Sequence, residues 1–76
     1  MDEHQIVTFL YSNWRGELTR RRCVPQPGTL RFVTTSWHPE PQWVFDAWDL
    51  DREALRTFGL AGISEWRASG VSNEAP

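Results

Sequence analysis

The chain has 76 residues, of which 39% are hydrophobic and five are Trp, so we expect one domain folded around a single core rather than a disordered chain. Its net charge of −2 argues against non-specific binding of nucleic acid through bulk electrostatics. A single cysteine, Cys23, excludes an internal disulfide, and no signal peptide or membrane-spanning run is visible, so we expect a cytoplasmic protein.

The N-terminal third of the sequence predicts two strands joined by a turn. Residues 5–11 are rich in β-branched and aromatic side chains, which favour a strand. Asn13 and Gly16, which follow, are typical turn formers. Residues 18–24 alternate as a second strand does, and the prolines and the glycine within residues 25–28 end it.

The middle of the chain predicts a third strand and then an ambiguous segment. Residues 29–35 alternate clearly, and the two prolines within residues 36–42 then break the chain. Residues 42–49 are compatible with a strand, or with a helix that groups Trp43 and Trp48 on one side. The upstream prolines and the aromatic enrichment favour the strand.

Residues 49–60 allow two interpretations. Asp49 or Asp51 can cap a helix, because the residues that follow are good helix formers. Alternatively, residues 49–54 form a polar hairpin loop that leads into a strand over residues 55–60. Local propensity favours the helix, and periodicity does not decide between the two.

The C-terminal segment shows no periodicity. From Ser64 onward the spacing of apolar residues is lost, and small and polar residues predominate. We therefore expect a single ordered domain over residues 1–66 and a disordered tail over residues 67–76.

Several short motifs, taken in chain order, resemble the signature of the WYL domain family. They are a strand that ends in Tyr, a Gly-Glu turn, an Arg followed by a Pro, a Trp-containing strand and a final Arg-Thr-Phe segment. In this chain they read "YSNWRGE", "RRRCVP", "QWVFDAW" and "RTFGLAGI". The matching residues are Tyr11, Asn13, Gly16, Glu17, Arg21, Pro25, Trp43, Ala47, Arg56, Phe58, Leu60 and Ile63.

The resemblance implies a mostly β fold, a small Sm-like or SH3-like barrel of about five antiparallel strands, with a hairpin rather than a helix at residues 49–55. It also implies a part in transcription regulation, because WYL domains usually follow a DNA-binding domain and sense a ligand such as a nucleotide or single-stranded nucleic acid. Two departures remove polar groups from that binding face. Val44 stands where the family has Tyr, and Ala61-Gly62 stands where it has Asp-Arg.

A cluster of arginines suggests where a ligand binds. All eight basic residues are Arg, whose planar guanidinium groups grip phosphates and stack on rings. If Arg21 and Arg56 converge on one side of the barrel, they can hold a phosphate while Trp43 or Trp14 offers a surface on which a base can stack. The predicted ligand-binding residues are Arg21, Arg22, Trp43 and Arg56.

The alternative is that these charges serve the fold alone. In that case Arg21 and Arg56 pair with Asp46 or Glu17, and the preference for Arg reflects a GC-rich genome. If the face around Asp46 is covered, its carboxylate needs a partner, for which Arg56 across the predicted hairpin is the candidate. We assign structural roles to Tyr11, Asp46 and Phe58.

Neither catalysis nor metal binding is expected. No Gly-rich phosphate loop, Ser-His-Asp arrangement or Cys-His nucleophile site is visible. His4, Cys23 and His38 lie in separate segments and lack the short spacing of metal ligands, so no metal or other cofactor is predicted.

Two main hypotheses for function follow, beside a third possibility, that the chain is a small orphan domain with no partner of its own. The first is a non-enzymatic, ligand-sensing module that binds a nucleotide or single-stranded nucleic acid through Arg and aromatic side chains. The second is a protein-interaction module, in which exposed aromatic residues or an open strand edge bind a regulator or a second copy of the chain.

Overall fold

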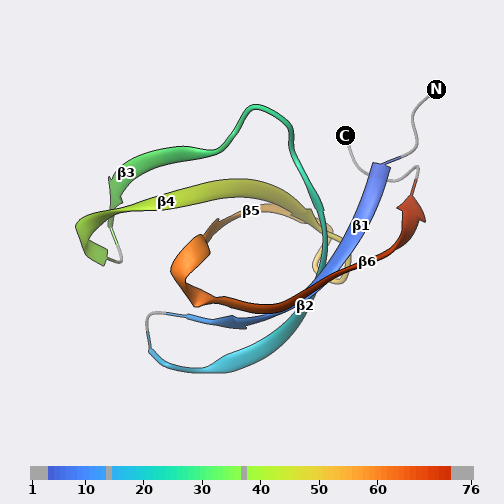
Figure 1. The fold of residues 1–76 in the computed structure, drawn as a ribbon, viewed down its shortest axis with the longest axis horizontal. Coiled ribbons are helices and arrows are strands. Elements are labelled where there is room, and N and C mark those ends of the chain that lie inside the picture. Colours follow the sequence, from blue (N-terminus) through green and yellow to red (C-terminus); the bar gives the residue numbers. More distant parts are fainter. Residues whose placement is uncertain (1–3, 14, 37, 73–76) are drawn as a thin grey trace.

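The structure, a computed structural model, describes residues 4–13, 15–36 and 38–72. It is built from six antiparallel strands in one sheet, with a single 3₁₀ turn (Figure 1). The elements are β1 (His4–Ser12), β2 (Leu18–Pro25), β3 (Arg31–Thr35), β4 (His38–Asp49), β5 (Ala54–Gly59), η1 (Leu60–Gly62) and β6 (Ile63–Ser72). The prediction of a small, mostly β fold is confirmed, with six strands in place of about five.

The strands pair so that the sheet curls around its own interior. β5 pairs with β4, β4 with β2, β2 with β1, and β1 with β6. The turn η1 then brings the chain from the end of β5 back to β1, where Ile63 lies opposite Tyr11 (Figure 1). Within the described residues no backbone ladder joins β5 to β1 or to β6, so a seam remains between these strands.

β4 is the longest strand and serves two partners along one of its edges. Its C-terminal half pairs with β2 and its N-terminal half with β3, while β5 occupies the other edge from Val44 to Asp49. The hairpin of β3 and β4 therefore extends beyond the end of β5, away from β1 and β6 (Figure 1). We call this extension the β3–β4 arm.

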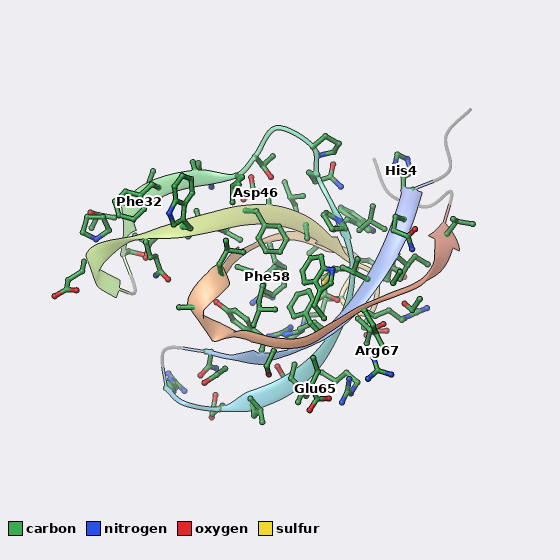
Figure 2. The ribbon with its side chains drawn as sticks, in the orientation of Figure 1. His4, Phe32, Asp46, Phe58, Glu65 and Arg67 are labelled. Carbon is green, nitrogen blue, oxygen red and sulfur yellow. The ribbon has the colours of Figure 1, made fainter. Side chains whose placement is uncertain are left out.

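The main core cluster consists of side chains on the concave face of the curled sheet, and Ile6, Val24 and Leu50 form a second, smaller cluster. Alternation along each strand points the residues of the main cluster inward, and they are Val7, Phe9, Tyr11, Cys23, Phe45, Ala47 and Phe58. Phe9 and Tyr11 both meet Phe58 edge to face, with ring centroids 5.3 and 5.0 Å apart, and Figure 2 shows Phe58 enclosed by the sheet. The indole of Trp66 stacks on Phe9 at 5.3 Å and covers the core from β6.

The turn between β1 and β2 forms as predicted. The Oδ1 atom of Asn13 accepts hydrogen bonds from the backbone N–H groups of Arg15 and Glu17, at 2.9 and 3.0 Å. Gly16 takes a φ of 80°, a conformation that glycine adopts without steric cost.

The segment from residue 42 to residue 60 is a hairpin and not a helix. β4 and β5 pair in register, with Phe45 opposite Phe58, and residues 50–53 form the turn. Oδ1 of Asp49 accepts hydrogen bonds from the backbone N–H groups of Asp51 and Arg52, so the acid that can start a helix closes the hairpin instead. Tertiary pairing thus overrides the local helix propensity.

Two predictions about the limits of the strands are wrong. The disordered tail was expected from residue 67, but β6 continues to Ser72, where it pairs with His4 of β1. The prolines within residues 36–42 were expected to break the chain, yet β4 begins at His38. Prolines are tolerated there because this part of β4 extends beyond β5 and leaves one edge unpaired. In the part of the chain that the structure describes, no helix is long and apolar enough to cross a membrane.

Candidate anion-binding site

A cavity of about 360 Å³ opens at the seam between β5 and the strands β1 and β2. Its volume falls within the range of small-molecule sites, which is roughly 300 to 1,000 Å³. It is lined by residues from three strands and the turn after β1: Tyr11, Asn13, Arg21, Leu55, Arg56, Thr57 and Phe58. Among the described residues, the lining includes two cationic side chains and no acidic one.

Arg21 forms the buried wall of this cavity. Alternation along β2 points its side chain inward, opposite Phe9, and leaves it only 9% exposed. Its Nη1 donates a hydrogen bond to Oδ2 of Asp49 at 3.2 Å, and its guanidinium lies 5.7 Å from the centroid of the Phe58 ring. Its Nε has no hydrogen-bond partner among the described residues. The guanidinium therefore has donor capacity that the protein does not use.

Arg56 supplies the second charge of the cavity. It lies opposite Ala47 in the β4–β5 ladder, on the same face of the sheet as Phe58 two residues later. Its side chain is half-buried, and no hydrogen bond or ion pair is found for it in the described part of the chain. An unpaired cation beside a buried one gives the cavity a positive potential.

The free edge of β5 adds neutral donors to the same seam. The backbone N–H of Gly59 donates to the hydroxyl of Tyr11 at 3.1 Å, which shows that odd-numbered residues of β5 point their backbone groups away from β4. The N–H groups of Leu55 and Thr57 therefore face the seam. Tyr11, which accepts from Gly59, keeps its own hydroxyl proton to donate.

Asp49 holds the cavity wall in place from behind. Its side chain is 2% exposed, and besides Arg21 it binds the backbone of the β4–β5 turn through Oδ1. The carboxylate therefore ties the turn before β5 to Arg21 and partly offsets the buried charge. The sequence pattern predicts no role for Asp49 beyond that of a possible helix cap.

The four predicted ligand-binding residues do not gather at one place. Arg21 and Arg56 meet at the cavity, as the arginine hypothesis requires. Arg22 points to the outer face, as the neighbour of Arg21 on a strand must, and its Nη2 lies 3.6 Å from Oδ1 of Asp51. Trp43 lies on the β3–β4 arm, because β5 pairs with β4 only from Val44 onward. The prediction that Trp43 and Arg22 share a surface with the other two is wrong. Trp14, the alternative stacking residue, lies outside the described residues.

The predicted partner of Asp46 is also wrong. Asp46 lies opposite Thr57, whose hydroxyl donates to its Oδ1 at 2.6 Å, and Nη2 of Arg31 lies 3.2 Å from the same oxygen. Arg56 belongs to the other face of β5 and does not reach this carboxylate. The hydrogen bond from Thr57, followed by the bond and the charge of Arg31, lowers the pKa of Asp46 from its ordinary value of 3.8.

The other two residues assigned structural roles lie in the core and at the cavity together. Phe58 is 2% exposed and Tyr11 is 8% exposed, and both belong to the main core cluster. Their rings pack edge to face and form part of the cavity lining.

The two departures from the WYL pattern have structural consequences. Val44 is fully buried and lies outside the cavity lining. Gly62 packs against β1, where an added Cβ would meet the carbonyl oxygen of Ser12 and lie 3.1 Å from the Tyr11 ring. A side chain such as Arg has no room at residue 62 in this structure.

No cluster of three or more metal-ligating side chains is found within the described ranges. Comparisons of the chain with protein families, with curated proteins and with solved structures find no match.

Proposed function

We propose that this chain is a non-enzymatic binding module, similar to WYL domains, whose Arg21–Arg56 cavity takes a small anionic ligand. The chemistry of the cavity favours the phosphate of a nucleotide or of single-stranded nucleic acid. In this proposal the module senses such a ligand in the cytoplasm and contributes to transcription regulation.

One observation carries the proposal. Arg21 is nine-tenths buried, yet its guanidinium has one carboxylate contact and a free Nε, and it lies at a cavity shared with the unpaired Arg56. A buried arginine normally has its donors satisfied, because an unmet buried charge is costly. An anion in the cavity would give Arg56 a partner and would add a negative charge beside Arg21.

The surroundings favour a phosphate over a carboxylate. The two arginines, the Tyr11 hydroxyl and the edge N–H groups of Leu55 and Thr57 approach the cavity from three strands. A phosphate group can accept from several directions at once, whereas a carboxylate accepts mainly in one plane. The half-exposed Leu55 at the rim leaves an apolar contact for the rest of the ligand.

The test is a titration at low salt of two fluorescent probes, a labelled mononucleotide and a labelled oligothymidylate, followed by anisotropy. Arg56→Gln is the informative variant, because Arg56 has no partner whose loss would disturb the fold. We expect it to weaken binding at least tenfold, since charge-assisted hydrogen bonds contribute about 1.5 to 3 kcal/mol. Arg67→Gln is the matched control, since it removes the same charge from an exposed position on β6 outside the cavity (Figure 2).

The outcomes separate cleanly. Saturable binding that Arg56→Gln weakens and Arg67→Gln leaves within about twofold supports the cavity as the site. Equal losses of affinity in both variants would mean that net charge alone attracts the probe. Binding that does not saturate up to about 1 mM protein would exclude a dissociation constant below about 1 mM and would contradict the proposal.

A further inference from the structure

The β3–β4 arm carries an open strand edge. β3 pairs only with β4, so its other side has no partner within the described chain. The backbone N–H of Gln26 donates to the carbonyl of Asp46, which shows that even-numbered residues of β4 point toward β2 and β3. Arg31, opposite Val44, therefore points its backbone groups toward β4, and Phe32 and Thr34 point theirs outward.

The other free edges of the sheet are less available. β6 pairs with β1 through two register shifts, against one between β3 and β4 at Val33/Thr35, and only β6 of these two strands contains residues with positive φ, Glu65 at 54° and Gly70 at 123°. Such irregularities twist an edge and hinder the addition of another strand. β5 faces the cavity at the seam. β3 is therefore the edge best suited to pairing with another chain.

Exposed aromatic rings lie directly beside this edge. Phe32 and Trp43 face each other across the β3–β4 ladder, with ring centroids 5.4 Å apart, and they are 56% and 50% exposed. Figure 2 shows Phe32 on the arm, far from the enclosed Phe58. Leu30, just before β3, is 58% exposed and extends this apolar surface toward the body of the sheet.

The exposed apolar area is large enough to contribute to an interface. Aromatic side chains present about 150 to 250 Å² each, so the half-exposed Phe32 and Trp43 with Leu30 leave roughly 300 Å² of apolar surface uncovered. The largest apolar patch on a monomer is about 300 to 600 Å² and often marks a binding site. A standard interface buries about 800 Å² per partner, a little over half of it apolar, so this patch supplies roughly two thirds of the apolar area of one side.

The edge is also compatible with a copy of itself. Arg31 is the single charged residue of β3, and its Nη2 lies 3.2 Å from Oδ1 of Asp46, so the charge is balanced within the chain. Two identical edges can pair antiparallel about a two-fold axis, which places the same groups opposite each other and closes the assembly at two copies.

We propose that the chain self-associates as a two-fold dimer through its arm. β3 of one copy pairs antiparallel with β3 of the second, and Phe32 and Trp43 of each copy pack against the arm of the other. Self-association leaves the cavity between β5 and β1 open, so the dimer and the ligand site are separate properties.

Sedimentation equilibrium of the full chain, without ligand, from about 1 µM to 1 mM tests the proposal across the affinity range of weak and moderate dimers. The chain has a mass of 8.9 kDa, and a dimer has twice this mass, so the two species are easily told apart. Thr34→Pro removes an outward N–H and no bond to β4, and Trp43→Ser removes the exposed indole. We expect each variant to lower the association constant at least tenfold, while circular dichroism verifies that both keep the native fold.

Leu18→Ser is the matched control, because Leu18 is 61% exposed on β2, away from the arm, and its replacement should leave the association constant within about twofold. A wild-type chain that stays monomeric throughout overturns the proposal. Dimerisation unchanged by Thr34→Pro or by Trp43→Ser, or abolished by Leu18→Ser, would place the contact on another surface and overturn it equally.

Discussion

Arg21 and Asp49 form an ion pair inside the curled sheet, with Nη1 and Oδ2 3.2 Å apart and side chains that are 10% and 2% exposed. Two groups of opposite charge thus lie side by side where water hardly reaches. The pair links the wall of the cavity to the turn between β4 and β5, because the second oxygen of Asp49 binds the backbone of that turn. A ligand that engages Arg21 therefore acts on a group whose position depends on Asp49.

Removal of the Asp49 charge should be costly to stability. Asp49→Asn keeps an oxygen for the turn but leaves Arg21 buried without a counter-ion, so we expect the free energy of unfolding to fall by about 3 kcal/mol. Urea denaturation measures this, with Asp51→Asn as the control. Asp51 is 61% exposed and pairs with Arg22, and its loss should cost less than about 1 kcal/mol. Equal effects of the two variants would contradict the importance of the buried pair.

The hydrogen bond from Thr57 to Asp46 should make the free energy of unfolding depend on pH in the acidic range. This bond and the neighbouring Arg31 lower the pKa of Asp46 below 3.8, so the folded state favours the carboxylate. The resulting stabilisation is complete above pH 3.8 and is lost as the pH falls through the lowered pKa. Thr57→Val should therefore reduce stability by about 1 kcal/mol at neutral pH, with a difference from wild type that shrinks below pH 3.8.

Urea denaturation at a series of pH values measures the effect of Thr57→Val. Thr8→Val is the control, because the hydroxyl of Thr8 bonds the hydroxyl of Ser69 and neither group titrates. Its cost should stay constant over the same range. A constant cost for Thr57→Val as well would show that Asp46 is not the group responsible.

The Cys23 thiol should be unreactive in the folded chain, and its burial should make the stability of the fold decrease at alkaline pH. Its side chain is fully buried, and burial, followed by the charge of Asp49, raises the pKa of the thiol from 9.0 to about 12. The neutral thiol is favoured in the folded state, so this stabilisation is complete below pH 9.0 and is lost as the pH rises toward 12.

Two measurements test the thiol. A disulfide reagent at pH 8 should label Cys23 only as fast as the chain unfolds, which follows from a thiol that is neither exposed nor ionised. Cys23→Ala should show a weaker loss of stability than wild type between pH 9 and pH 12. Rapid labelling of the native chain would show that the thiol is accessible. Identical losses of stability with pH in wild type and Cys23→Ala would show that the pKa of the thiol is not raised.

Most of the strands could be predicted from the sequence, because alternation and turn residues mark them. The meeting of Arg21 and Arg56 was a hypothesis that required their strands to bring them to one side of the barrel. β6 beyond Trp66 could not be predicted. Its residues from Ser64 to Val71 are all exposed, and backbone pairing with β1 holds the strand, so no alternation of apolar and polar side chains marks it. Pairing through the backbone leaves little trace in side-chain pattern.

The details of the site depend on register, which the sequence does not reveal. Asp49 reaches Arg21 because it lies opposite Cys23, two residues further along β2. Trp43 misses the cavity because the β5 ladder begins at Val44, one residue too late to include it. A shift of one residue in pairing moves a side chain to the other face, so single positions were harder to predict than whole strands.

Gly62 should be intolerant of any side chain. It lies where η1 passes β1, and a Cβ there would collide with the carbonyl oxygen of Ser12 and press on the Tyr11 ring. Backbone atoms cannot turn aside as a flexible side chain can, so Gly62→Ala should force η1 away from β1. We expect a loss of about 1 to 3 kcal/mol in the free energy of unfolding, the usual range for overpacking.

Ala61→Gly is the control, since Ala61 is exposed and its exchange should cost about 1 kcal/mol or less. Because Tyr11 also lines the cavity, Gly62→Ala should disturb ligand binding together with stability, as seen in the same anisotropy titration. A variant as stable as wild type would mean that η1 does not press against β1 and that the seam beside the cavity is looser than this geometry requires.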